Sequence, residues 1–529
     1  MTAGRPPKSS TWQTQEPAVV TLARNVSTRY VLVVVNVLIG LVMLRYNVQH
    51  LGPATYGLWM LAASMTPYLT ALDFGYGSAV VRYVAEFRVR RDVRALNEVL
   101  STMAYVLSAV GALCYLAAIV AAVLFPYLFN VEPNQIQTGR FVLLMTSLQV
   151  ALFFPFSIYG GVINGFERYY INNVVGLTFN IITAIVNVVV LQLGYGLLEL
   201  VACTTVLRIL PLWIYRRNAY RVFPELRVKR RYFRRDRLRE LSGFSVYVAV
   251  VDWAGRLTYA TDTFFLGVLM NTAAVAVFSV AQRISETMLT LTLQIHTFMM
   301  PAVVNRAIGG ELERQRELLV RATRFQLAIA MCLCGGVAVL ADVVIRTWLG
   351  AGWDDSVRVT QVLALVVVLR ALMAMPITVL QGTGDQKFVA AAAAWSALVN
   401  LALSIPFVWL GGVAGIAIAT AVAALVGVIL IFPRSCRAVG LGTWQGGVRI
   451  VVPTVWPAAI AMALILGMQR TLGAGMTPVL AALLVGGLVY MGLFLMFGLD
   501  RDERQWALSA FRRIAGTRSR RLATSDVIG

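Results

Sequence analysis

Long apolar runs recur along almost the whole chain, and they constrain its fold more than any single motif. A helix needs about 20 apolar residues to cross the hydrocarbon core of a bilayer. Fourteen such spans would use roughly 280 positions, and the chain has 529. Only 13% of the residues are charged, whereas about 25% is usual in soluble domains. We therefore predict an all-α integral membrane protein with about 14 transmembrane helices.

The predicted spans fall into two pseudo-symmetric six-helix lobes followed by two C-terminal helices. They lie near 26–49, 55–78, 100–126, 139–163, 170–192, 195–216, 241–269, 273–304, 322–348, 357–381, 388–409, 412–434, 447–469 and 476–498. The corresponding domains are a cytoplasmic N-terminal tail at 1–24, an N-lobe at 25–216, a basic linker at 217–240, a C-lobe at 241–435, two further spans at 436–499 and a basic tail at 500–529.

A weak internal repeat supports the two-lobe interpretation. One proline-started half-span begins at Pro155, ends in a glycine-rich turn and precedes a span with Asn180. Another begins at Pro376, ends in a similar turn and precedes a span with Asn400. Corresponding interrupted segments in two halves are typical of duplicated transporters.

The net charge of +21 would suggest a nucleic-acid partner in a soluble protein. Here the basic residues gather in alternate connections between the spans, the longest being 216–240. By the positive-inside rule this pattern predicts that both termini lie in the cytoplasm. Residues 1–24 are polar and have no apolar core of a cleavable signal peptide.

Four motifs carry a family resemblance. They are LGP-x-x-YGLW from Leu51, LDFGYGSAVVRYVAE from Leu72, P-F-S-x-Y-x-G-x-x-x-G-F-x-R-Y from Pro155 and G-x-G-D-x-K from Gly382. Together they resemble bacterial polysaccharide flippases of the multidrug, oligosaccharidyl-lipid and polysaccharide exporter superfamily. The resemblance implies a polyprenyl-diphosphate-linked glycan as substrate, a cationic central cavity, rocking of two lobes and a place in the bacterial inner membrane.

Polar side chains inside three predicted spans form stripes along one helix face. An ionised side chain at the bilayer centre is costly and normally faces protein or water. The stripes are Asn25, Arg29, Asn36 and Asn47 on span one, Asp252, Arg256, Tyr259 and Thr263 with Asp262 at the margin on span seven, and Ser279, Arg283, Glu286, Thr290, Gln294 and Thr297 on span eight. They could join helices through pairs such as Asp252–Arg256 and Arg283–Glu286. We favour the alternative, that they line a water-filled cavity.

The residue types then predict roles. Arginine binds phosphate oxygens in a planar, bidentate manner, so Arg29, Arg256 and Arg283 are the candidate ligands of a diphosphate. The candidates for sugar hydroxyls are Asn36, Gln294 and Thr297, and those for a coupling proton or sodium ion are Asp73, Asp252, Asp262 and Glu286. Four other charged residues, Arg208, Asp342, Arg346 and Arg370, receive no role because they lie near span ends or on unassigned faces.

The leading functional hypothesis is a flippase that makes and breaks no covalent bond. An ion-coupled multidrug exporter and a peptidoglycan-precursor flippase are the alternatives. A membrane glycan polymerase or glycosyltransferase is disfavoured, because such enzymes usually need a sizeable outer loop with catalytic groups. None of the five cysteines has metal-site spacing, so we expect no metal, disulfide or cofactor. The expected partners are membrane lipid, an undecaprenyl-diphosphate-linked glycan and a glycan polymerase, with no nucleic acid and a monomeric protein.

Overall fold

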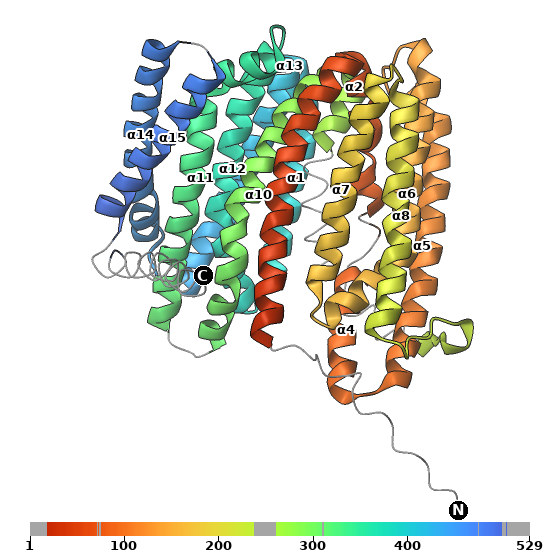
Figure 1. Ribbon diagram of the computed structural model, residues 1–529. Coiled ribbons are helices and arrows are strands. Elements are labelled where there is room, and N and C mark those ends of the chain that lie inside the picture. Colours follow the sequence, from red (N-terminus) through yellow and green to blue (C-terminus); the bar gives the residue numbers. More distant parts are fainter. Residues whose placement is uncertain are drawn as a thin grey trace, which may run out of the picture. The chain divides into compact units, whose positions relative to one another are not determined.

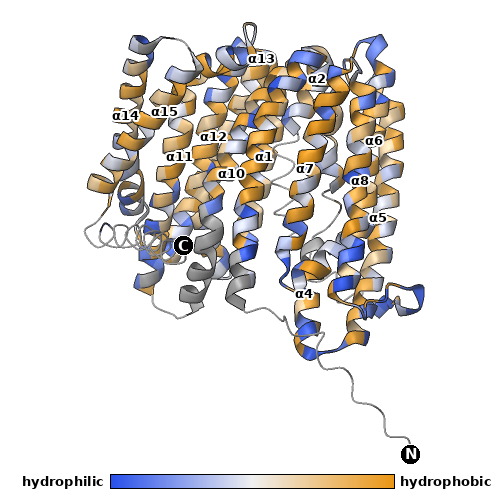
Figure 2. Cartoon of the chain, viewed as in Figure 1, coloured by the Kyte–Doolittle hydropathy of each residue, from blue (hydrophilic) through white to orange (hydrophobic). Residues whose placement is uncertain are grey.

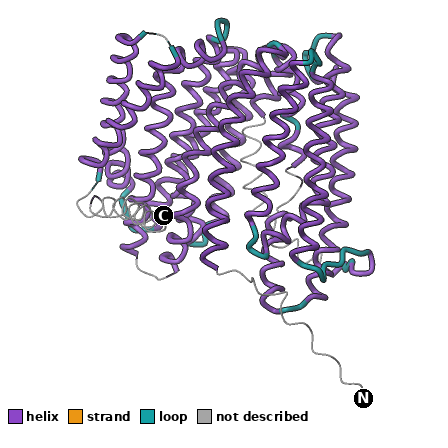
Figure 3. The backbone as a smooth tube through the Cα atoms, in the orientation of Figure 1, coloured by secondary structure: helices purple, strands orange, loops and turns teal. Residues whose placement is uncertain are grey.

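The computed structural model describes residues 18–70, 72, 76–236, 261–308, 312–473, 475–499 and 504. Over these residues the chain is helical almost throughout, and they contain no strand (Figure 3). The chain divides into two compact units. One comprises residues 1–283 and 390–423, and the other comprises residues 284–389 and 424–529.

The first unit contains the helices that form the candidate site. In chain order they are α1 (Ala18–Leu51), α2 (Pro53–Ala63), α3 (Thr66–Thr70), α4 (Tyr76–Arg90), α5 (Val93–Leu128), α6 (Ile136–Gly165), α7 (Tyr169–Gln192) and α8 (Leu197–Val222). Residues 261–269 are also helical. Local chemistry explains several helix starts. Pro53 occupies the first turn of α2, where its missing N–H is not needed, and Asp92 caps α5 by accepting from Ala95 N at 2.9 Å.

The second unit contains most of the C-terminal helices. They are α11 (Leu312–Leu349), α12 (Asp354–Gly382), α14 (Thr443–Leu472) and α15 (Met476–Leu493), which continues as a short π-helical turn at Phe494–Gly498. Two helices are shared between the units, α10 (Thr272–Ile308) and α13 (Gln386–Ala438).

Helix α13 is two membrane spans joined at one residue. Its 53 residues would reach about 80 Å as one straight helix, far beyond a bilayer core of about 30 Å. Gly412 interrupts it with φ 55° and ψ −134°, a conformation that glycine adopts without steric cost. The break agrees with the predicted spans at 388–409 and 412–434.

Ten helices among the described residues are long and apolar enough to cross a membrane, with α13 counted once. Their side chains are mostly hydrophobic along the helix length, while hydrophilic residues gather near helix ends (Figure 2). The prediction of an all-α integral membrane protein is confirmed. The number fourteen and the lobe boundaries stay predictions, because most of the predicted seventh span and nearly all of the C-terminal tail lie outside the described residues.

Small residues let the helices of the first unit pack closely, as is usual in membranes. Gly111 of α5 lies against the backbone of Ala151 in α6, and Gly161 and Gly165 of α6 receive Val80 and Val84 of α4. These valines are fully buried in a core that α4, α5, α6 and α8 share. The neighbouring ribbons of α5, α6 and α8 are visible in Figure 1. This packing fixes the helices that surround the cavity described next.

Candidate functional site

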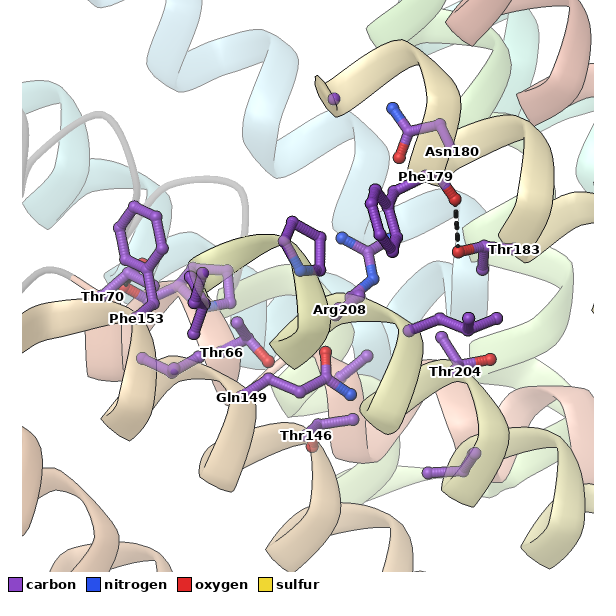
Figure 4. Close-up of a pocket in the computed structure, with 18 of the residues that line it drawn as sticks. Thr66, Thr70, Thr146, Gln149, Phe153, Phe179, Asn180, Thr183, Thr204 and Arg208 are labelled. Atoms are coloured by element: carbon purple, nitrogen blue, oxygen red, sulfur yellow. Dashed lines mark hydrogen bonds between the residues drawn. The ribbon is translucent and has the colours of Figure 1, made fainter. Parts of the chain in front are cut away.

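A cavity of about 630 Å³ lies inside the first unit. Residues of α2, α3, α6, α7 and α8 line it (Figure 4). The volume falls in the range of about 300–1,000 Å³ that is typical of small-molecule sites. All of these helices belong to the N-terminal part of the chain, so the cavity is complete within one unit.

Arg208 is the one charged side chain among the described residues that line the cavity. It lies near the middle of α8, and Figure 4 shows it extending into the pocket beside Phe179. The side chain remains exposed to solvent although it lies among membrane-spanning helices. An arginine at this depth normally faces water or a ligand. The cavity therefore offers a cation to whatever enters it.

Arg283 brings a second cation close to Arg208. It lies on α10 within the first unit, and its guanidinium packs against Gly40 of α1 so tightly that a Cβ there would overlap it. The two arginines are near enough to repel each other electrostatically. Such repulsion is strong where few water molecules screen it, and a bound anion would convert it into attraction.

The remaining polar groups of the cavity are mostly amides and hydroxyls. Thr183 donates to the Phe179 carbonyl oxygen at 2.7 Å, a bond drawn in Figure 4. Gln149 donates through Nε2 to Thr205 Oγ1 at 2.7 Å. Asn180 donates to Asn36 Oδ1 at 2.9 Å. These bonds hold the side chains in place and leave the wall suited to further hydrogen bonding with a polar, uncharged ligand.

The rest of the wall is aromatic and apolar. Trp59, Phe153, Phe179 and Tyr215 line the cavity together with Pro67 and Pro211. Pro211 stands inside α8 one turn after Arg208, where its ring removes one backbone hydrogen bond. Gly176 contributes no side chain, and a Cβ there would meet only Tyr215 Oη, at 3.8 Å. Flat aromatic faces beside amides and hydroxyls are suited to sugar rings.

The predicted stripe on α1 contacts α7. Asn25 donates to the Glu167 carbonyl oxygen at 2.7 Å and accepts from Tyr170 N at 2.9 Å. Asn36 is half-buried and bonds Asn180, whose side chain lines the cavity. These two asparagines therefore join helices, and Asn36 does so at the cavity edge. Arg29 is exposed on the same helix.

The structure places the other predicted site residues as follows. Arg283 lies in the first unit, whereas Glu286 and Gln294 lie half-buried on the part of α10 that belongs to the second unit. Gln294 donates to the Thr290 carbonyl oxygen at 3.4 Å. The side chains of Asp73, Asp252, Arg256 and Thr297 lie outside the described residues. The predicted roles of the whole set stay predictions.

Asp262 forms a separate buried cluster in the first unit. Its side chain is 2% exposed. Thr420 donates to Oδ2 at 2.6 Å, and Asn400 lies 3.5 Å from Oδ1. Asn400 also donates to Thr420 Oγ1 at 3.0 Å. A carboxylate buried among membrane helices is costly, and here only neutral groups are shown to bond it.

Sequence reasoning missed Arg208, and with it the cavity wall formed by α6, α7 and α8. The stripes drew attention to spans one, seven and eight, whereas the cavity helices α6 and α8 carry isolated polar residues rather than stripes. One signal was present: Arg208 is the twelfth residue of the 26-residue helix Leu197–Val222. An arginine at mid-span indicates a functional position by default.

A multi-pass helical membrane protein with a cation in a cavity between its helices is the class that this fold and site define: a membrane transporter. Residues 48–358 match the family model described as polysaccharide biosynthesis protein. The match covers more than half of the chain, and the chain belongs to this family.

Individual relatives agree with this assignment. A Shigella flexneri protein provisionally named an O-antigen transporter is 22% identical over 378 residues, which cover 70% of this chain and 85% of that protein. The lipid II flippase MurJ in an inward closed conformation superposes with a TM-score of 0.72 at 14% identity, over 91% of this chain and 99% of that one.

An inward-facing multidrug transporter of the MATE family superposes with a TM-score of 0.61 at 17% identity, over 80% of this chain and 99% of that one. At these identities the two structures establish the fold alone. With the family match, they confirm the predicted resemblance to polysaccharide flippases of this superfamily.

Proposed function

We propose that the protein is a flippase that moves a polyprenyl-diphosphate-linked oligosaccharide or polysaccharide precursor across the bacterial cytoplasmic membrane by alternating access. One observation carries the proposal: Arg208 is the one charged side chain among the described residues that line the cavity, and it extends into that cavity. A diphosphate bound there would receive charge-assisted hydrogen bonds from its guanidinium group. The polysaccharide biosynthesis family and the O-antigen transporter relative support a glycan as the cargo.

The cavity wall supports the same substrate class. Gln149, Asn180 and Thr183 provide amide and hydroxyl groups, and Trp59 and Tyr215 provide aromatic surface. Neutral hydrogen-bonding groups beside aromatic rings suit sugar units, whose edges carry hydroxyls and whose faces carry C–H groups. A volume of about 630 Å³ admits a short glycan segment but no long polymer.

The reaction that we propose makes and breaks no covalent bond, so the protein is a carrier and no enzyme. Its place is the inner membrane with both termini in the cytoplasm, as the alternation of basic connections indicates. We expect a monomer that receives its substrate from the lipid bilayer and delivers it to a glycan polymerase.

Ion coupling is the second part of the proposal. Of the two acidic candidates whose side chains the structure describes, Asp262 is the buried one, with Thr420 and Asn400 as neutral hydroxyl and amide partners. A buried carboxylate beside a hydroxyl oxygen is suited to a proton or to a hard cation such as sodium. We propose that this group carries the coupling ion.

The alternatives predict different cargo. An exporter of organic cations needs an acidic cavity, and the one charged side chain among the described cavity residues is Arg208. A peptidoglycan-precursor flippase would also bind a lipid diphosphate. Only the sugar part of the substrate therefore distinguishes it from the proposed flippase.

The decisive experiment reconstitutes the purified protein in vesicles with defined lipids. Fluorescent polyprenyl-diphosphate-linked glycans, lipid II and a cationic dye are each loaded into one leaflet or compartment, and their transfer is measured. We expect transfer of the glycan lipid alone. Transfer of the dye without the glycan lipid would refute the proposal. Transfer of lipid II alone would show that the substrate is lipid II and not the proposed glycan lipid.

A further inference from the structure

The segment that follows α8, residues 223–236, is strongly basic and lies away from the cavity. It carries six exposed cations, Arg227, Lys229, Arg230, Arg231, Arg234 and Arg235, against two exposed acids, Glu225 and Asp236, for a net charge of +4. We call it the basic strap. In Figure 1 it is the yellow-green loop at the foot of α5, and in Figure 2 it is hydrophilic.

Three buried polar residues of α5 hold the backbone of the basic strap. Asn97 donates to the Glu225 carbonyl oxygen at 3.0 Å and accepts from Arg227 N at 2.7 Å. Ser101 donates to the Arg227 carbonyl oxygen at 3.1 Å, and Thr102 accepts from Arg234 N at 3.0 Å. All three side chains are at most 3% exposed. The strap is therefore fixed on α5, and its cations lie at a defined position along the axis of that helix.

An aromatic contact also fixes the position of the strap along the axis of α5. The ring of Phe233 meets Tyr105 of α5 edge-on, with centroids 6.1 Å apart. Tyr105 begins an exposed face of α5 that continues at helical spacing and ends at Tyr127. Its large apolar members are Leu113, Leu116, Val120 and Val123, each at least 52% exposed.

This exposed face has the length of a bilayer core. Tyr105 and Tyr127 are 22 positions apart, a rise of about 33 Å along a helix, and the hydrocarbon core is about 30 Å thick. Tyrosines at both ends match the aromatic belts at membrane–water interfaces. The face therefore contacts lipid, and Tyr105 marks one boundary of the hydrocarbon.

The cations from Lys229 to Arg235, which follow the contacts with Ser101 and Thr102, consequently lie in the headgroup layer. Ser101 and Thr102 lie three to four residues beyond Tyr105, a rise of about 5–6 Å, and the headgroup region extends about 5–8 Å from the core on each side. We propose that the basic strap binds the phosphate groups of anionic phospholipids. Arginine recognises such oxygens by paired hydrogen bonds, and each basic residue at this depth strengthens attraction to an anionic leaflet.

Phospholipid fits this surface better than the transported substrate does. Helix α5 contributes no side chain to the cavity described above, and the neighbouring face of α5 is open to the bilayer. The inference is independent of the proposed function, because a lipid-binding strap could serve a carrier of any cargo.

The test titrates phosphatidylglycerol, or phosphatidylcholine as reference, into the detergent-purified full-length protein and follows binding by native mass spectrometry. The variant R230Q/R231Q/R235Q removes three cations of the strap. The matched control R90Q/R91Q/R94Q removes three exposed arginines at the α4–α5 turn, about 16 Å beyond Tyr105 along α5. The variant R230K/R231K/R235K keeps the charge, and a thermal unfolding scan of each protein confirms folding.

A basic residue at the surface is worth about 1 kcal/mol, or roughly fivefold in affinity. We expect the glutamine variant of the strap to lose at least tenfold of its preference for phosphatidylglycerol, and the control and lysine variants to lose less than threefold. Equal losses in the strap variant and the control, or no loss in the strap variant, would overturn the inference. It would also be overturned if the strap variant kept phosphatidylglycerol binding and lost only the binding of a polyprenyl diphosphate.

Discussion

Replacing Arg208 by glutamine tests whether this arginine binds the ligand or stabilises the fold. Arg208 lines the cavity and experiences the charge of Arg283. Glutamine keeps hydrogen-bonding capacity and much of the length but removes the charge. If Arg208 binds the diphosphate, affinity falls. If its charge mainly opposes that of Arg283, the protein itself becomes no less stable.

The magnitude follows from the interaction that is lost. A hydrogen bond to a charged group contributes about 1.5–3 kcal/mol, and each 1.4 kcal/mol is about tenfold in a binding constant. We therefore expect Arg208→Gln to weaken binding of a polyprenyl diphosphate by about 10- to 150-fold. Removing the repulsion between Arg208 and Arg283 should leave the unfolding temperature equal to or above that of the wild type.

The assay is calorimetric titration of the purified protein with a short-chain polyprenyl diphosphate, paired with thermal unfolding. Arg358→Gln is the matched control, because Arg358 is exposed on α12 and lies outside the cavity. Affinity within twofold of the wild type for Arg208→Gln would refute its role as a phosphate ligand. A drop in both affinity and unfolding temperature would show that the arginine stabilises the fold instead.

Three further predictions test other parts of the molecule. Asp262→Asn should fold with at least wild-type thermal stability but abolish the dependence of vesicle transport on an ion gradient; unaltered ion dependence would exclude Asp262 as the coupling group. Gly161→Ala should overlap Val80 and cost about 1–3 kcal/mol of stability. Gly447→Ala, with nothing within 4 Å, should be neutral or stabilising by up to about 1 kcal/mol; equal unfolding temperatures for the two alanine variants would contradict the packing argument. Asn97→Ala removes two hydrogen bonds to the basic strap worth about 1 kcal/mol each, so tryptic cleavage within the strap should rise by roughly 30-fold; an unchanged rate would mean that Asn97 does not hold it.

The architecture could be predicted from the sequence because a bilayer imposes simple rules. Each span must satisfy its own backbone hydrogen bonds and present an apolar surface of fixed length, so apolar runs locate the helices directly. Even the division of α13 was predicted, because Gly411 and Gly412 interrupt the apolar run. The break between α2 and α3 at Ser64 and Met65 was not predicted, although Pro67 in the first turn of α3 marks a helix start.

The site was harder to predict because polarity alone does not tell which surface a residue contacts. Asn25 and Asn36 follow the same helix face as Arg29, yet both asparagines bond residues in or beside α7. Arg208 has Thr204 and Tyr215 on the same helix face, but the sequence analysis assigned no polar stripe to this span. The cavity emerges only when α2, α3, α6, α7 and α8 are placed around one space, and single-helix periodicity contains no such information.

The predicted internal repeat offers an argument that the buried carboxylate of Asp262 has a role beyond helix packing. Asn180 and Asn400 stand in the spans that follow the two predicted half-span motifs, and each bonds a polar residue of an earlier helix. In the N-terminal half the partner is the neutral Asn36, at 2.9 Å, whereas in the C-terminal half it is Asp262, at 3.5 Å. A pair of asparagines thus suffices to join these two helices, so packing alone does not require a carboxylate at the second position. Asp262→Asn would recreate the chemistry of the N-terminal pair and relieve the cost of a buried charge. The buried carboxylate therefore carries a cost that the asparagine pair avoids, and we predict that binding of a transported ion offsets this cost.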